Sequence, residues 1–173
     1  MGIGYRVGQF WRNMSASPLP AEAMEGVTAV LTTAEMALFN RFSLSDQQHS
    51  YRVLCALQTA GQTEPSLLTA ALLHDVGKSC YSLKVWERSL AVLLAIIMPQ
   101  RVKIWGQGEA RGWRRPFVVK VQHPDWGADM VAAAGGCPLT VALIRRHQEV
   151  LPETADSPED QLLRLLQWAD DQS

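Results

Sequence analysis

Apolar residues recur at helical spacing along most of the chain, and residues that start or end helices separate the apolar segments. The pattern predicts helices over residues 20–42, 45–61, 65–78, 82–100, 117–136, 138–150 and 158–171. Ser45 and Gln48 have the spacing of a capping box, and Pro65 suits a first helical position. Pro124 is expected to interrupt the helix that contains it. Strand signals are weak, so the predicted fold class is all-α.

Two segments depart from this amphipathic pattern. Residues 90–98, "LAVLLAIIM", are continuously apolar. They are too few to span a bilayer, and we expect them to be buried or to meet a partner. Residues 101–116 contain three glycines and five basic residues, and they are predicted to form a loop. We expect a single domain over residues 20–173, preceded by an arm over residues 1–19.

The composition is that of an ordinary globular protein. Hydrophobic residues make up 47% and charged residues 19% of the 173 residues, which is enough apolar material for one substantial core. The formal net charge is −1, so no attraction of the whole protein to nucleic acid or to a membrane is expected. The three cysteines form no C-x-x-C pair and the first twenty residues lack a signal-peptide core. A cytoplasmic protein with reduced thiols is therefore expected.

The ionisable residues within the apolar segments are the candidates for chemistry. The chain has four histidines, each on or beside a different predicted helix: His49, His74, His123 and His147. Asp75 follows the second histidine directly, and Asp170 lies near the end of the last helix. Burying such groups costs several kcal/mol unless they are satisfied, and a metal ion satisfies imidazole and carboxylate together. For any one histidine alone, a hydrogen-bonded or surface position is the simpler interpretation.

The ordered set resembles the signature of the HD superfamily of metal-dependent phosphohydrolases: a histidine, a His-Asp pair and a distal aspartate. The segments "VQHPDWGADMV" and "ALIRRHQE" are similar to those that add two more histidines in the two-metal branch of that family. The resemblance covers residues 45–171. It implies a compact helical bundle of about six to eight helices around a metal site.

The resemblance also implies a ligand set and a reaction. One divalent ion would be held by His49, His74, Asp75 and Asp170, and a second by Asp75 as a bridge with His123 and His147. Iron or manganese is favoured, with magnesium, nickel or zinc as alternatives. A metal-bridged hydroxide would cleave a phosphoester or phosphoanhydride. Lys78 would bind a phosphate or the leaving oxygen; its position equally suits a solvated lysine at a helix end.

The substrate implied is a small phosphate compound such as a nucleotide. No Gly-Tyr-Pro segment occurs, Gln148 replaces a second histidine, and Ser45 stands where a third metal would need a glutamate. These departures argue against cleavage of cyclic dinucleotides, while hydrolysis of dinucleoside polyphosphates stays an alternative. Basic residues suited to phosphate are predicted to bind the substrate: Arg111, Arg114, Arg115 and Arg146. Trp105 and Trp113 could stack a base, or they could pack on the helices.

Other function classes remain open from the sequence. The helical shell could serve as a non-catalytic ligand sensor or partner-binding module, and the apolar run could form a homodimer. Binding of nucleic acid through the basic segment is disfavoured by the net charge and the shortness of that segment.

Overall fold

The computed structural model describes residues 17–173. Within them the chain forms nine α-helices, two 3₁₀ helices and no strand, so the all-α prediction is confirmed. The elements are α2 (Ala21–Val30), α3 (Thr33–Phe39), α4 (Leu44–Thr59), α5 (Pro65–Leu73), η1 (Val76–Cys80), α6 (Val85–Ile97), α7 (Pro99–Trp105), η2 (Gly112–Arg114), α8 (Arg115–Ala133), α9 (Pro138–Arg146) and α10 (Pro158–Gln172). The predicted N-terminal arm lies, except for its last three residues, outside the described part of the chain.

Caps decide where two of the predicted helices begin and end. The segment 20–42 contains two helices rather than one, because Thr32 and Glu35 form a capping box that starts α3. The N-cap of α4 is Ser43, whose hydroxyl accepts from the backbone N–H of Asp46. The predicted capping box at Ser45 is therefore wrong by two residues.

Pro124 lies inside α8, which continues through it, so the predicted interruption is wrong. A proline has no N–H to donate to the carbonyl four residues earlier, which belongs to Lys120. The imidazole of His123 fills that role. Its Nδ1 lies 3.1 Å from the Lys120 carbonyl oxygen and 2.9 Å from that of Val119. The helix stays intact because the neighbouring side chain replaces the missing donor.

The segment after η1 also differs from expectation. The predicted helix 82–100 ends at Ile97, and Pro99 begins the separate helix α7. The predicted loop 101–116 is wrong in part, since its first five residues belong to α7 and residues 112–114 form η2. Proline suits the first turn of a helix, where no N–H bond is lost, which explains why the chain restarts there.

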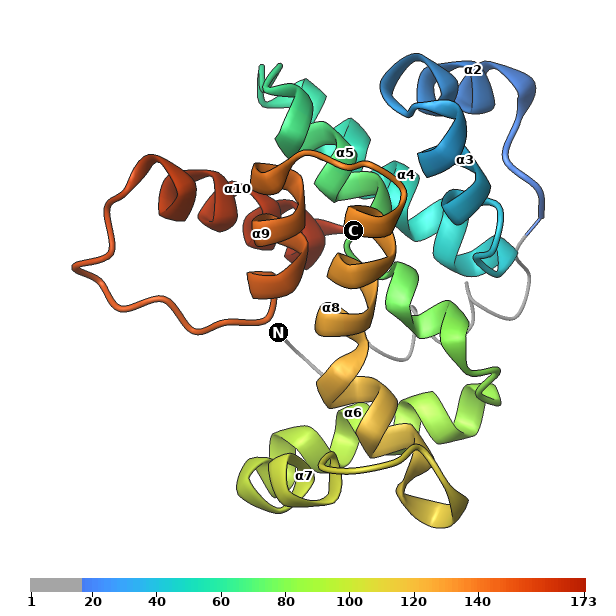
Figure 1. Cartoon of the computed structure of the whole chain (residues 1–173), viewed down its shortest axis with the longest axis vertical. Helices are drawn as coiled ribbons and strands as arrows, with labels where there is room; N and C mark the ends of the chain where they lie inside the picture. Colours follow the sequence, from blue (N-terminus) through green and yellow to red (C-terminus); the bar gives the residue numbers. More distant parts are fainter. Residues whose placement is uncertain (1–16) are drawn as a thin grey trace.

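The helices divide into a main body and a projecting lobe. The main body has one core, which is formed by α2 to α5, the second half of α8, α9 and α10. Its largest buried side chains include Leu54, Leu72, Leu143 and Leu166. Helices α6 and α7 pack with the start of α8 around a small cluster made by Ala91, Val102 and Phe117. We call residues 84–120 the α6–α7 lobe; Figure 1 shows α6 and α7 at one end of the molecule, far from α2.

The lobe does not bury the apolar run 90–98. Ala91 is the one residue of that run in the buried class, whereas Leu93, Ile96 and Ile97 are more than half exposed. The expectation of burial within the chain is therefore wrong, and that of a partner stays a prediction. Among the described residues, no helix combines the length and the apolarity that crossing a bilayer requires.

Candidate metal centre

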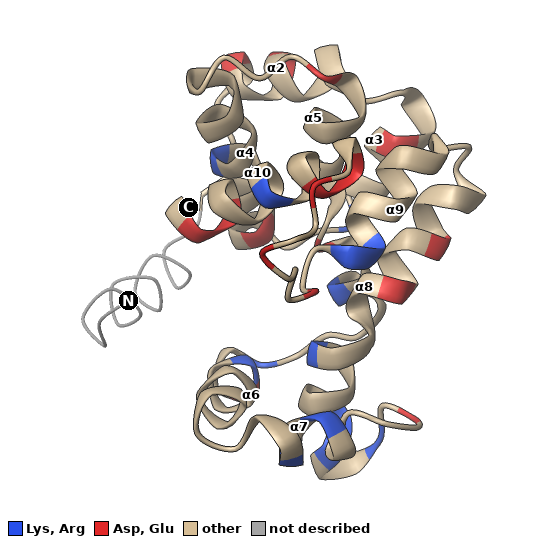
Figure 2. Cartoon of the chain, turned by 90° about the vertical axis from the view of Figure 1, so that its left-hand side faces the viewer, with Lys and Arg blue, Asp and Glu red and all other residues tan. Residues whose placement is uncertain are grey.

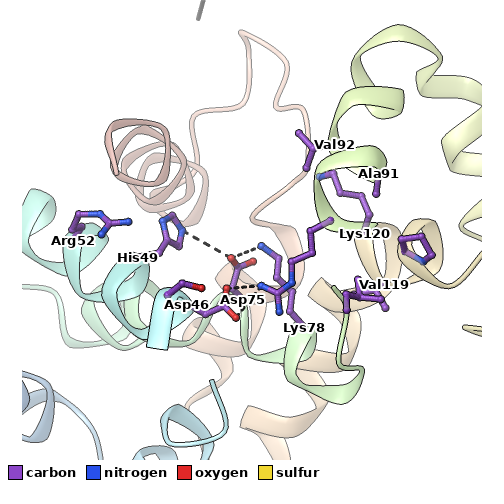
Figure 3. A pocket seen from close by; sticks show the side chains of 13 residues that line it. Asp46, His49, Arg52, Asp75, Lys78, Ala91, Val92, Val119 and Lys120 are labelled. Atoms are coloured by element: carbon purple, nitrogen blue, oxygen red, sulfur yellow. Dashed lines mark hydrogen bonds and ion pairs between the residues drawn. The ribbon is translucent and has the colours of Figure 1, made fainter. Parts of the chain in front are cut away.

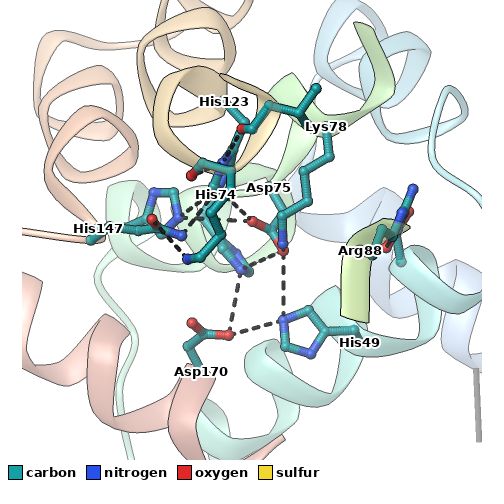
Figure 4. Close-up of polar contacts among 12 residues, drawn as sticks. His49, His74, Asp75, Lys78, Arg88, His123, His147 and Asp170 are labelled. Atoms are coloured by element: carbon teal, nitrogen blue, oxygen red, sulfur yellow. Dashed lines mark hydrogen bonds and ion pairs between the residues drawn. The ribbon is translucent and has the colours of Figure 1, made fainter. Parts of the chain in front are cut away.

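Helices that are distant in the sequence bring the six predicted ligands to one place, and Figure 4 shows their side chains close together. The ligands sit on α4 (His49), at the end of α5 (His74), just before η1 (Asp75), within α8 (His123), at the end of α9 (His147) and near the end of α10 (Asp170). Helix termini supply half of the set, so the packing of the helix ends decides the geometry of the site.

The ligand atoms form two groups, and within each group they lie within 4.8 Å of one another. In the first group, Oδ1 of Asp170 lies 2.9 Å from Nε2 of His49 and 3.6 Å from Nε2 of His74. In the second, Nε2 of His123 lies 3.2 Å from Oδ1 of Asp75 and 3.3 Å from Nε2 of His147. Each group has the donor set of an N/O metal site.

Asp75 joins the two groups because its two carboxylate oxygens face different histidines. Oδ2 lies 3.5 Å from Nε2 of His74 and 3.9 Å from Nε2 of His49. Oδ1 faces the second group, and it lies 3.8 Å from Nε2 of His147. A carboxylate in this position can serve one ion with each oxygen. The placement agrees with the bridging role that the resemblance implies.

The backbone orients three of the four histidines through their Nδ1 atoms. In His74, Nδ1 lies 3.0 Å from the carbonyl oxygen of Ala71. The same atom of His123 lies 2.9 Å from the carbonyl oxygen of Val119, and that of His147 lies 2.7 Å from the carbonyl oxygen of Ile144. A carbonyl only accepts, so these contacts assign the proton to Nδ1 in each ring. The Nε2 lone pairs of His123 and His147 are then left for a ligand, which is the usual arrangement of metal-binding histidines. Nε2 of His74 can serve in the same way once it has lost its proton.

This arrangement leaves acceptors facing acceptors. With their protons on Nδ1, the Nε2 atoms of His123 and His147 point at each other and at the Asp75 carboxylate. Nε2 of His74 is buried and has no hydrogen-bond partner among the described residues, and it lies 3.5 and 3.6 Å from carboxylate oxygens of Asp75 and Asp170, so a proton or a metal ion suits this position. Gln148 and Lys78 place donors next to His123 and Asp75, but the acceptors of the group still face one another, which is costly when they are buried. A cation between them relieves that cost. The residues present therefore fit a divalent metal centre.

The histidines of the two ligand groups differ in the direction in which their pKa values are shifted. Burial lowers the pKa of His74, but Asp75 and Asp170 outweigh it and raise that pKa to about 10. Burial, together with the two neighbouring imidazoles, lowers the pKa of His147 to about 3, and burial also lowers the pKa of His123. Burial would raise the pKa of Asp170, yet His49 and His74 hold it well below its usual range. The second group is thus neutral imidazole plus carboxylate, ready for a cation.

A close backbone contact sets the position of Asp75 relative to α8. Gly77 lies so near α8 that a Cβ placed on it would be 2.0 Å from the His123 carbonyl oxygen and 2.8 Å from the Gly127 nitrogen. Position 77 must therefore be glycine for η1 and α8 to approach this closely. A Cβ on Gly127 would lie 3.2 Å from the Gly77 nitrogen, so glycine there relieves a tight contact. The approach brings His123 within reach of the Asp75 carboxylate.

His49 and Asp75 line a pocket of about 230 Å³ beside the metal centre. Asp46, His49 and Arg52 of α4 form one side, as Figure 3 shows, while Asp75 and Lys78 lie between them and the lobe. The opposite wall is largely apolar and comes from the lobe and the residue just before it: Leu83, Ala91, Val92, Pro116, Val119 and Lys120. The pocket thus combines a charged side at the metal centre with an apolar wall.

Lys78 lines this pocket and pairs with the Asp75 carboxylate. Burial lowers the pKa of Lys78, but the charges of Asp75 and Asp46 outweigh it and raise that pKa. The side chain is therefore a stable ammonium beside the bridging carboxylate. The alternative of a simply solvated lysine is not what the structure shows.

The four arginines predicted to bind the substrate lie elsewhere in the described structure. None of them lines the pocket beside the metal centre. Arg111 is largely exposed and pairs with Glu109, and the guanidinium of Arg114 lies 5.4 Å from the Trp113 ring centroid. Trp113 and Trp105 also contact each other edge to face. Substrate binding by these side chains stays a prediction.

The other two arginines join structural elements. Arg115 donates two hydrogen bonds to Glu87, which ties α8 to α6. Arg146 contacts Glu149, Glu159 and Asp160, and the last two lie in the first turn of α10. That network fixes α10 against α9 and so helps to place its ligand, Asp170.

Sequence reasoning missed cations that do line the pocket. Arg52 lies one turn after His49 on α4, so helical spacing alone puts the two on one face. Arg88 reaches the pocket from α6 and donates to both carboxylate oxygens of Asp46 at 2.8 and 3.0 Å. No local signal in the sequence connects Arg88 with Asp46, because the two residues are far apart along the chain.

Comparison with known proteins adds one finding. A family model described as HD domain matches residues 47–172, a range that contains all six candidate ligands. Neither the curated proteins nor the solved structures gave a match to the chain.

Proposed function

Because the chain belongs to the HD domain family, we propose that it is a metal-dependent phosphohydrolase of the two-metal type, acting on a small phosphate compound such as a nucleotide. The observation that carries this proposal is the pair of ligand groups joined by Asp75. A site for a single ion would not require His123 and His147 to converge on the second oxygen of that carboxylate.

The residues of the site have separate roles in the proposed reaction. The two groups would hold divalent cations, which supply the Lewis acidity that activates a water and withdraws charge from phosphoryl oxygens. The backbone carbonyls hold the Nδ1 protons of His74, His123 and His147, which keeps each ring in one orientation. Lys78 keeps a positive charge at the mouth of the site, where it can bind a phosphoryl oxygen or the leaving oxygen.

The pocket supports a substrate of modest size with one apolar part. Arg52, Lys78 and Lys120 supply positive charge for a phosphate, whereas Leu83 and Val92 supply an apolar wall. The volume of about 230 Å³ lies below the range of about 300–1,000 Å³ that encloses larger ligands. A mononucleotide-sized phosphoester suits this space better than a dinucleoside polyphosphate, which would have to extend beyond the pocket.

The test uses the full chain, stripped of metal and reloaded with Mn²⁺ or Fe²⁺. Metal content is measured by elemental analysis. Phosphate release is measured with p-nitrophenyl phosphate, nucleoside monophosphates, diadenosine tetraphosphate and a cyclic dinucleotide. We expect metal-dependent release, fastest from the mononucleotide-sized esters. The variant Asp75→Asn should lower the rate about 100-fold or more, since it removes the charge shared by both groups.

Asp171→Asn is the matched control, because Asp171 neighbours a candidate ligand but is exposed and belongs to neither ligand group. It should retain full activity and metal content. Bound metal with no release from any compound in the panel would favour the non-catalytic sensor module. Undiminished activity of Asp75→Asn in the presence of metal would show that the proposed site is not the catalytic one.

A further inference from the structure

The outer surface of the α6–α7 lobe is unusually apolar. Six large side chains on it are each between 54% and 66% exposed: Trp86, Leu93, Ile96, Ile97, Ile104 and Trp113. Single exposed apolar residues are common on soluble proteins, but a group of this size on one small substructure marks a surface that binds something.

Helix α6 shows that this exposure has a regular pattern. Trp86, Leu90, Leu93 and Ile97 are separated by four, three and four residues, so they form one stripe along the helix, and each of them is exposed. Ala91 faces the other way and is buried in the small cluster of the lobe. The helix therefore has an inner apolar face that packs within the chain and an outer apolar face that no described residue covers.

Positive charge accompanies this apolar surface. Residues 84–120 contain eight lysines and arginines and only two acidic residues, whereas the rest of the chain contains eight basic and fifteen acidic residues. Both acidic residues of the lobe are paired within it, Glu87 with Arg115 and Glu109 with Arg111. Figure 2 shows the basic residues around α7 and most acidic residues on the main body. The net charge of −1 is therefore the sum of a basic lobe and an acidic remainder of the chain.

We propose that the α6–α7 lobe docks on an anionic lipid surface. Aliphatic side chains such as Ile97 and Ile104 would enter the boundary between headgroups and acyl chains, where burial of apolar surface drives binding. Trp86 and Trp113 have the amphipathic rings that favour this depth. Arg101 and Lys103 are exposed on α7 next to Ile104, and they would meet the phosphates of the headgroups.

Charge distinguishes this occupant from a second copy of the chain. A symmetric dimer formed through the lobe would bring two strongly basic surfaces together, and their repulsion would oppose the apolar contact. A lipid surface of negative charge has no such penalty. The binding surface also differs from the metal pocket, because the pocket uses the inner face of α6 through Ala91 and Val92.

Flotation of the full chain with lipid vesicles tests the proposal. One set of vesicles is phosphatidylcholine alone, and the other contains phosphatidylcholine and phosphatidylglycerol in equal parts. We expect binding to the anionic vesicles to exceed binding to the neutral ones about tenfold, and to weaken as salt rises from about 0.1 to about 0.5 M, where charges are screened. Equal binding to both vesicles, or none to either, would overturn the proposal.

Two variants and two controls locate the surface. Ile97→Ser with Ile104→Ser, and separately Arg101→Gln with Lys103→Gln, should each lower vesicle binding about tenfold, with an unchanged circular dichroism spectrum because all four side chains are exposed. Val150→Ser and Arg41→Gln change exposed residues outside the lobe and should have no effect. Sedimentation velocity is measured on each protein. A dimer that the isoleucine variant dissociates, without vesicle binding, would assign the surface to a second copy and contradict lipid docking.

Discussion

At the scale of single residues, the carboxylate of Asp75 has the most demanding position in the molecule. It is buried, it contacts histidines on both sides, and it pairs with Lys78. Burial alone would raise its pKa, but Lys78 and His74 hold that pKa well below its usual range. The carboxylate is therefore ionised near neutral pH, as a bridging ligand must be.

Lys78 gives a prediction at this scale. In the metal-loaded protein, Lys78→Gln should lower the rate of phosphate release about 10- to 100-fold with unchanged metal content, because the charge that binds the phosphoryl group is lost. Lys78→Arg should recover a large part of the rate, since it restores the positive charge. Both rates are measured with the best substrate of the panel. Loss of metal from Lys78→Gln would instead assign the lysine to the stability of the centre.

At the scale of elements, the contact between η1 and α8 decides whether the two ligand groups can share one carboxylate. Gly77 and Gly127 allow the backbones to touch. Pro124 leaves the Lys120 carbonyl open to the His123 ring, so the helix itself orients a ligand. Two glycines and one proline thus help to place the ligands Asp75 and His123.

Two glycine substitutions test the importance of that contact. Gly77→Ala should lower the free energy of unfolding by about 1–3 kcal/mol, because the added methyl would collide with the backbone of α8. Gly26→Ala is the matched change within α2, where the new Cβ would lie 3.8 Å from the Tyr51 ring. It should raise the free energy of unfolding by about 0.5–1 kcal/mol. Urea denaturation of the metal-free protein measures both, and a similar effect of the two changes would contradict the proposed close contact.

At the scale of the whole molecule, bound ions would tie together helices that are distant in the sequence. The ligands come from α4, the α5–η1 junction, α8, α9 and α10. Ions that bind the folded state and not the unfolded chain stabilise the fold in proportion to the logarithm of their concentration. The metal centre is therefore expected to contribute to stability as well as to chemistry.

Thermal unfolding measures this contribution. A metal ion at about 100 times its Kd adds about 2.7 kcal/mol to the free energy of unfolding, which should raise the Tm of a chain of this length by about 5–10 °C. Excess chelator should reverse the rise. In Asp75→Asn the rise should be small, because both groups lose the shared carboxylate; an equal rise in that variant would place the ions elsewhere.

Binding of the ions should also release protons. The pKa of His74 is raised to about 10 in the metal-free protein, so near neutral pH its ring carries a proton on both nitrogens. An ion that binds Nε2 must displace one of them, and about one proton should be released per chain. Affinity should consequently rise with pH up to the pKa of His74. Titration calorimetry in buffers of different ionisation enthalpy measures the release; a heat independent of the buffer would contradict the assignment of His74 as a ligand.

The sequence alone determined the fold class, the approximate helices and the six candidate ligands. Helical periodicity and ligand chemistry are local properties, which can be recognised from residue type and order. His74 and Asp75 illustrate this, since their pairing at a helix end already indicated a shared site.

Only the tertiary structure decided which cations surround that site and which surfaces remain uncovered. Arg88 and Asp46 meet across the pocket although they are far apart in the chain, while Arg146 turns to the start of α10. The apolar pattern of α6 predicts burial or a partner, and the structure shows that α7 and the start of α8 cover only one face of that helix. Contacts between distant segments depend on packing in three dimensions, and the order of residues along one segment does not contain that information.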